Sequence, residues 1–158
     1  MSSENELNFC PRYASKEISF MMYNFQNINK LVERRKDELI ATINVTNSAW
    51  LKSINQDGNS LEDIVASFDD DRKIVRLKQW KSFLISFFNI LKKFERPIYY
   101  QFVNLKYIKK LDNKEIMKYL KLTKKALREL EMQLKWIVYK YAIKDELFKE
   151  EVAESVQM

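Results

Sequence analysis

A single glycine, Gly58, and two prolines, Pro11 and Pro97, stand in this chain of 158 residues. Tight turns between strands depend on glycine and on similar turn-forming residues, so the chain has little material for a sheet of short strands. Lysine, leucine, isoleucine and glutamate are the commonest residues instead, and three of these, lysine, leucine and glutamate, rank among the better helix formers. The sequence therefore predicts an all-α fold, a helical bundle built on one core.

No stretch of the chain is typical of a membrane segment or a secretory signal. The apolar runs 83–85 and 87–88 are separated by Ser86 and flanked by Lys81 and Lys92, which leaves them far short of the roughly 20 apolar residues that a bilayer requires. The opening residues MSSENE lack the basic start and the apolar stretch of a signal peptide. We therefore expect no membrane partner and a cytoplasmic location.

Residues that carry enzyme chemistry are scarce. The chain has no histidine, and its one cysteine, Cys10, lies in a segment with the character of a tail. Without histidine there is no common general base or metal ligand, and one glycine excludes a glycine-rich phosphate loop. The run Asp69-Asp70-Asp71 has the oxygen ligands of a cation site, but its place before a helical pattern favours helix capping. We expect no enzyme, no cofactor and no metal.

The charge of the chain is unevenly distributed. Residues 1–71 hold 7 Lys and Arg against 12 Asp and Glu, residues 72–144 hold 20 against 5, and residues 145–158 hold 1 against 5. The middle segment thus carries a net charge of +15, whereas the overall charge is only +6. A solvated helical surface normally mixes both signs, so the excess indicates an anionic partner. Double-stranded DNA is favoured over a membrane surface, because the apolar residues of this segment are needed for its own core.

Three segments follow from this pattern: an N-terminal helical segment with tail and linker (1–59), a basic helical domain (60–144) and an acidic tail (145–158). Polar residues around Gly58 form the linker. Three-or-four spacing of apolar residues predicts an amphipathic helix from Lys16 to about Ile43 after a loosely attached start. Further helices are expected at about 61–67, at 71–94 with an apolar and aromatic core face, and at 97–107, where Pro97 suits a first turn.

The stretch DNKEIMKYLKLTKKALRELEMQL, residues 112–134, contains two helix starts close together. Asp112 with Glu115 has the spacing of a capping box, and it opens a helix to about Leu120. Thr123 then opens a second helix that reaches about Tyr139. Ile116, Leu120, Leu122, Leu127 and Leu130 would lock the two helices around a short turn. This pattern predicts a C-terminal helix-turn-helix, with the second helix in the recognition position.

The candidate DNA-binding residues lie in and around this pattern. Lys124, Lys125 and Arg128 occupy the side of the second helix that Leu127 and Leu130 leave free, near its N-terminus, where a recognition helix meets the major groove. On the same helix, Glu129 and Glu131 would repel phosphates. The full set of candidates is Lys114, Thr123, Lys124, Lys125, Arg128 and Lys135.

Residues 96–139 resemble the helix-turn-helix of sigma factor region four. The likeness rests on NKEIMKYLKLTKKALREL, in which Glu115, Ile116, Leu120, Leu122 and Thr123 match the family pattern. The chain departs from it at Met117, where a small residue is usual, and at Lys121, where glycine is common. Over residues 16–142 the layout is similar to RinA-type activators of phage late genes. The resemblance implies a phage-encoded activator of late genes that works with host RNA polymerase at the nucleoid of a bacterial cell.

Other readings of the same features stay open. A small divergent sigma factor would need a helix that melts promoter DNA, but Trp80, Phe83, Phe87 and Phe88 have the spacing of core residues. The small subunit of a phage terminase also joins a helix-turn-helix to helical oligomerisation elements. A helical protein-interaction module would direct its basic face toward an acidic partner. The acidic end segments would then serve for polymerase contact or for homo-oligomer formation.

Overall fold

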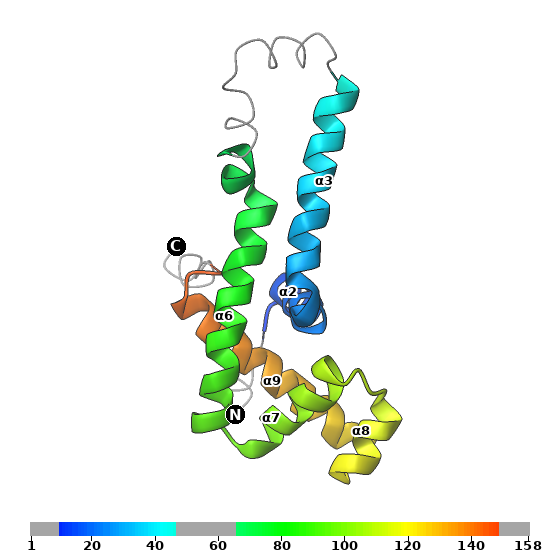
Figure 1. Cartoon of the computed structure of the whole chain (residues 1–158). Helices are drawn as coiled ribbons and strands as arrows, with labels where there is room; N and C mark the ends of the chain where they lie inside the picture. The colour runs from blue at the N-terminus through cyan, green and yellow to red at the C-terminus, as the bar shows by residue number, and fades with distance from the viewer. Residues whose placement is uncertain (1–9, 47–65, 149–158) are drawn as a thin grey trace. The chain divides into compact units, whose positions relative to one another are not determined.

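The computed structural model describes residues 10–46 and 66–148. Throughout these residues the regular structure is helical and no strand is present (Figure 1), which confirms the predicted all-α class. No helix within the described part is long and apolar enough to cross a bilayer. In chain order the elements are α2 (Arg12–Tyr23), η1 (Phe25–Asn27), α3 (Ile28–Thr46), α6 (Arg72–Phe94), α7 (Pro97–Val103), η2 (Asn104–Ile108), α8 (Asn113–Leu120) and α9 (Lys124–Lys144).

Two compact units make up the chain. The first comprises Met1–Gln26 and Ser82–Met158, and the second comprises Asn27–Lys81. Helix α6 contributes residues to both units. The segment 1–59 predicted from the sequence is thus divided between the two units. Three predicted features lie outside the described residues: the linker around Gly58, the helix start near residue 61, and residues 149–158 of the acidic tail. Residues 66–70 form one helical turn ahead of α6.

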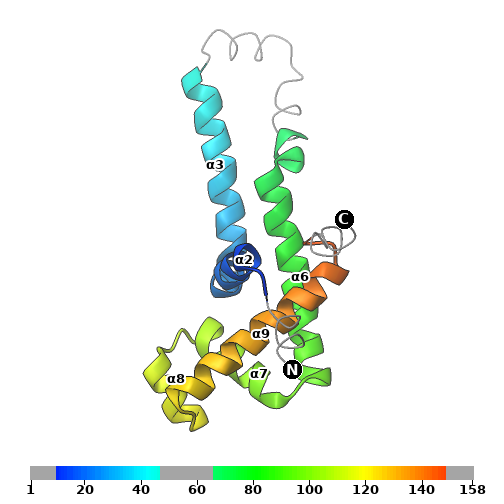
Figure 2. The ribbon, with the colours of Figure 1, turned by 180° about the vertical axis from the view of Figure 1, so that it is seen from behind.

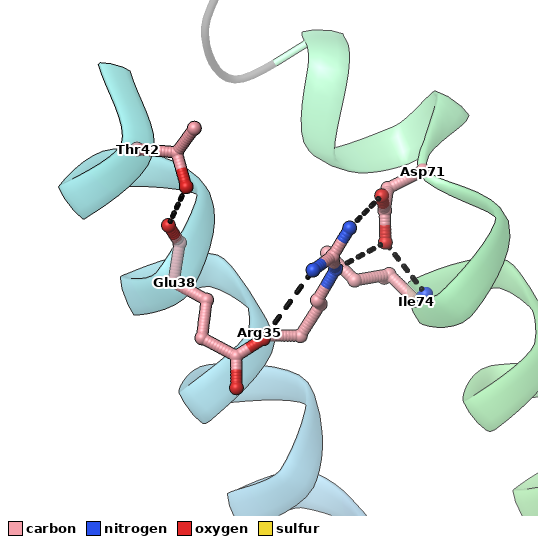
Figure 3. Close-up of polar contacts among 5 residues, drawn as sticks. All are labelled: Arg35, Glu38, Thr42, Asp71 and Ile74. Atoms are coloured by element: carbon pink, nitrogen blue, oxygen red, sulfur yellow. Dashed lines mark hydrogen bonds and ion pairs between the residues drawn. The ribbon is translucent and has the colours of Figure 1, made fainter. Parts of the chain in front are cut away.

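The second unit pairs α3 with the beginning of α6, which lie side by side in Figures 1 and 2. Arg35 of α3 joins them, because its guanidinium donates to both carboxylate oxygens of Asp71, at 3.1 Å from Nε and 3.1 Å from Nη2 (Figure 3). Asp71 Oδ2 also accepts the backbone N–H of Ile74 at 3.1 Å and so caps α6. The capping role predicted for the aspartate run is confirmed for Asp71, and its partner Arg35 adds a link that the local pattern did not reveal.

Helix α2 belongs to the first unit and packs against α9 and η2. Its apolar face is fully covered: Ala14, Ile18 and Met22 are each 0 % exposed. The prediction of a loosely attached start up to residue 15 is therefore wrong for residues 10–15, since Cys10 is buried as well. The local sequence pattern did not predict this burial, because α2 packs against α9, which lies near the other end of the sequence.

The prediction of one helix from Lys16 to Ile43 is also wrong, because α2 ends at Tyr23 and α3 begins at Ile28. Asn24 terminates α2: its backbone N–H and its side-chain amide both donate to the carbonyl of Phe20, at 3.0 and 2.8 Å. Asparagine side chains compete in this way with regular helical bonding. The apolar spacing continues across the break, so periodicity alone predicts a single helix over both segments.

The core of the first unit is formed by buried side chains of α2, α6, α7 and α9. Phe87 and Leu91 of α6, Phe102 of α7, and Leu134 and Val138 of α9 are all at most 1 % exposed. The predicted core character of the α6 aromatics is confirmed: Phe83 and Phe87 are buried and Phe88 is half-buried, and Trp80, which belongs to the second unit, is buried as well. Residues of α9 beyond Tyr139 continue this packing, with Ala142 fully buried, and this explains why α9 extends to Lys144.

Pro97 begins α7, as predicted, but the helix changes its winding after Val103. Residues Asn104–Ile108 form the π-helical segment η2, in which Leu105 and Tyr107 are buried. The backbone N–H of Leu111 then bonds the carbonyl of Leu105 at 3.0 Å. Lys110 has a left-handed backbone, with φ of 60°. This wide turn ends α7 and η2 and directs the chain into α8.

Candidate nucleic-acid interface

Helix α8 begins with the cap that its sequence predicts. Asp112 has extended backbone geometry, and its carboxylate accepts the backbone N–H of Glu115 at 2.8 Å. An N-terminal carboxylate satisfies a free helix donor and favours the positive end of the helix dipole. Ile116 is fully buried, whereas Lys114 in the first turn is exposed. The start of α8 is therefore fixed, and a lysine projects from it into solvent.

Three residues, Lys121 to Thr123, connect α8 to α9. Lys121 adopts the left-handed conformation, with φ of 57° and ψ of 48°, and the backbone N–H of Leu122 bonds the carbonyl of Met117 at 3.0 Å. Left-handed geometry is costly for a residue with a Cβ atom, and this is why glycine is common at such a helix end. The lysine at this position therefore retains glycine's backbone shape and adds a positive charge at the turn.

Thr123 opens α9, as predicted. Its hydroxyl oxygen accepts the backbone N–H of Ala126 at 3.1 Å. The first two apolar residues of the helix interior, Leu127 and Leu130, are 4 % and 6 % exposed and face the core, while Leu122 is half-buried. Because the Thr123 hydroxyl oxygen is used to cap the helix, Thr123 contributes to this surface by fixing where α9 begins.

The predicted cations separate into two groups. Lys114, Lys124, Lys125 and Arg128 are exposed, and within the described part of the chain none has a hydrogen-bond or ion-pair partner. Three of them share the first turns of α9, and Lys118 and Lys121 add exposed charges on α8 and in the turn. Lys135 differs, because its side chain is 22 % exposed and its ammonium lies 3.9 Å from Glu131.

Glu131 was expected to repel phosphates, but its negative charge is compensated within the fold by two lysines. Its carboxylate accepts from the ammonium of Lys106 in η2 at 2.5 Å, in addition to its contact with Lys135. The Lys106 ammonium also lies 5.6 Å from the ring centroids of Phe102 and Tyr107. Burial, and next the charge of Glu131, raise the pKa of Tyr107. Lys106 is 25 residues away in sequence, so no local pattern indicated this pair.

Lys110, in contrast, is engaged inside the protein. Its ammonium donates to the backbone carbonyl of Tyr23 and lies 3.4 Å from the centroid of the Tyr23 ring. Burial lowers the pKa of Lys110. The contact fastens the loop before α8 to the end of α2, which is 87 residues earlier in the chain. Lys110 is therefore not counted among the free cations of this surface.

A shallow groove of about 410 Å³ adjoins the turn between α8 and α9. Its lining combines apolar and polar side chains from α7, η2, α8 and the two turns that flank α8. Tyr119 on its edge is 69 % exposed. The residues that line it are Ile98, Gln101, Asn104, Leu105, Lys109, Tyr119, Leu120 and Lys121.

The thiol of Cys10 is buried and donates to the carbonyl of Pro11 at 3.6 Å. Burial raises the pKa of Cys10 to about 11, which suppresses the nucleophilic thiolate at neutral pH. Across residues 10–46 and 66–148, no group of three or more histidine, cysteine, aspartate or glutamate side chains is arranged to hold a metal ion.

No family model matches the chain, and neither the curated proteins nor the solved structures include a match.

Proposed function

We propose that this protein is a sequence-specific regulator of transcription that binds double-stranded DNA. In this proposal α8 and α9 form a helix-turn-helix, and the first turns of α9 enter the major groove. The contact takes place in the first unit, whose remaining helices hold α9 in position.

The observation that carries the proposal is the free positive charge at the turn between α8 and α9. Lys121, Lys124, Lys125 and Arg128 are exposed over eight consecutive positions that contain no acidic residue. The nearby Glu131 is compensated by Lys106 and Lys135. An anion approaching the start of α9 therefore meets unpaired cations together with the positive end of the helix dipole.

The cations take one of two roles in the proposal, base reading or phosphate contact. Arg128 is the base-reading residue, because a guanidinium can donate to both O6 and N7 of guanine. Lys124 and Lys125 contact phosphates near the helix start, Lys121 does so from the turn, and Lys114 does so from the first turn of α8. Phosphate contacts supply affinity and position, while base contacts supply specificity.

We further propose that the protein is encoded by a phage and activates late genes together with host RNA polymerase. This part rests on the resemblance of residues 96–139 to sigma factor region four and on the layout shared with RinA-type activators. Activation requires no bond chemistry: the protein has to bind beside a promoter and offer polymerase a surface. Self-association into a homo-oligomer would place two such units on one DNA site.

Footprinting of the full chain on phage DNA tests the function. Protection beside a late promoter, with increased transcription when polymerase is added, is the expected result. Protection at a packaging site would instead indicate a terminase small subunit, and the absence of protection would indicate a protein-binding module. In parallel, the logarithm of the affinity should fall linearly with the logarithm of salt concentration, with a slope that indicates roughly four or more phosphate contacts.

A further inference from the structure

Helix α9 carries one acidic residue that remains uncompensated near the cations proposed to meet DNA. Glu129 is exposed in the second turn of α9, and no described residue offers it a hydrogen bond or an ion pair. Glu131, two residues later, has two lysine partners. The two carboxylates therefore differ in their partners: Glu131 is paired with lysines of the protein, whereas Glu129 has no partner among the described residues.

The position of Glu129 on the helix places it outward. An α-helix turns by about 100° per residue, so residues three or four apart share a face. Leu127, Leu130 and Leu134 are buried and define the core side of α9. Lys125, Glu129 and Met132 lie on the opposite side, and all three are exposed. Glu129 thus lies on the solvent-facing side of α9, one turn after Lys125 and directly after Arg128 in sequence.

A free carboxylate at this place repels every phosphate and lowers affinity for DNA of any sequence. It becomes favourable only opposite a hydrogen-bond donor on a base edge. In the major groove the N4 amino donor of cytosine has an acceptor on one side only, O6 of the paired guanine, whereas the N6 amino group of adenine lies between two acceptors, its own N7 and O4 of the paired thymine. A carboxylate therefore suits cytosine better than any other base.

We infer that Glu129 is a specificity-determining residue that accepts a hydrogen bond from the N4 amino group of a cytosine in the target site. This inference rests on the proposed function, and it adds a second base-reading residue beside Arg128. The cation-rich start of α9 attracts DNA in general, and Glu129 restricts tight binding to sites with cytosine at one position.

Selection from a randomised duplex library, followed by binding measurements on the selected duplexes, tests the inference. The full chain should enrich duplexes with cytosine at a fixed position. Glu129→Gln keeps the shape and removes the charge, and a glutamine amide pairs with N6 and N7 of adenine. We expect the preference at that position to change from cytosine to adenine, with discrimination in favour of cytosine reduced at least about fivefold. Glu115→Gln is the matched control, because it removes an exposed carboxylate from the start of α8 and should leave all base preferences unchanged.

The results separate the two levels of the proposal. Glu129→Gln raising affinity for all duplexes by one factor, with the preferred bases unchanged, would show that Glu129 only repels phosphates and would overturn the inference while DNA binding stands. A parent chain that enriches no sequence would overturn the proposed function itself. Circular dichroism of the variants should match the parent, since neither glutamate side chain is in the core.

Discussion

Single residues at the turn between α8 and α9 combine backbone geometry with charge. Lys121 shows this most clearly, because its left-handed backbone is the shape that glycine takes without strain. Arg128, Lys125 and Glu129 show the complementary case, in which the backbone is regular and only the exposed side chain matters. Substitutions here should therefore separate fold stability from DNA affinity.

Lys121→Gly should stabilise the fold and weaken DNA binding. Relief of the left-handed geometry contributes about 1 kcal/mol to the free energy of unfolding, reduced in part by the greater freedom of glycine in the unfolded chain. Loss of the ammonium removes about one phosphate contact and flattens the salt dependence. Chemical denaturation and binding titrations measure the two effects. Lys118→Ala, which removes a neighbouring exposed charge within α8, should weaken binding with no gain in stability; a gain in both variants would contradict the geometric explanation.

Arg128→Ala should cost about 1 to 3 kcal/mol of binding free energy at the cognate site and relax discrimination at one base pair. Lys125→Ala should weaken binding to all sequences about equally, because phosphates carry no sequence information. Competition titrations with cognate and unrelated duplexes measure both. If Arg128→Ala lowers specific and non-specific affinity by the same factor, Arg128 is a phosphate contact and the proposed placement of α9 in the groove is wrong.

At the scale of elements, local signals predicted where several helices begin. Asp71, Pro97, Asp112 and Thr123 each begin a helix at or next to the predicted residue, since a cap or a first-turn proline acts within four residues of itself. The break at Asn24 was missed, because apolar spacing runs through it.

Contacts between distant elements were not predictable from local patterns. Arg35 with Asp71, Lys106 with Glu131 and Lys110 with Tyr23 join residues that are 36, 25 and 87 positions apart. Of the candidate site, the exposed cations of α9 followed from helical spacing. The internal neutralisation of Glu131 did not, because it depends on where η2 lies against α9.

The link between α3 and α6 gives a pH prediction. The Arg35 guanidinium, hydrogen-bonded to the carboxylate, holds the pKa of Asp71 below its ordinary value of 3.8. A carboxyl whose pKa is lowered by folding stabilises the fold above its unfolded pKa, and this stabilisation is lost as the pH falls below 3.8 toward the lower folded value. Asp71→Asn keeps a capping side chain but loses the charged pair, so its melting temperature should lie below that of the parent at pH 7.

The difference between Asp71→Asn and the parent should shrink as the pH falls below 3.8 and the parent carboxyl becomes protonated. Thermal melting followed by circular dichroism at several pH values measures it. Asp70→Asn is the control, since Asp70 is exposed next to Asp71. Equal melting temperatures for Asp71→Asn and the parent at pH 7 would show that the ion pair contributes nothing to stability.

For the whole molecule, the beginning of the chain completes a unit whose other helices come much later. Residues up to Gln26 group with residues from Ser82 onward, and α2 packs on α9, the helix that carries the proposed DNA contacts. The stability of the proposed DNA-binding surface should therefore depend on side chains more than 100 positions away from it in sequence.

Ile18→Ala and Phe20→Ala test this dependence. Ile18 is 0 % exposed and Phe20 is 53 % exposed on the same helix. Removing the buried side chain should destabilise the first unit by about 2 to 5 kcal/mol, and removing the exposed one should have a much smaller effect. Denaturation monitored by tryptophan fluorescence and circular dichroism measures both. Similar small losses for the two variants would mean that α2 contributes little to the stability of α9.

The buried thiol of Cys10, just before α2, makes the rate of thiol labelling a probe of local opening at this end of the first unit. Cys10 is the chain's one cysteine, it is 9 % exposed, and its raised pKa keeps it protonated at neutral pH. Burial and the raised pKa slow the reaction of this thiol with an alkylating reagent, so a change in the labelling rate reports a change in its exposure next to α2. If DNA engages α9 in the arrangement proposed, added duplex should slow the labelling of a cysteine that DNA never touches.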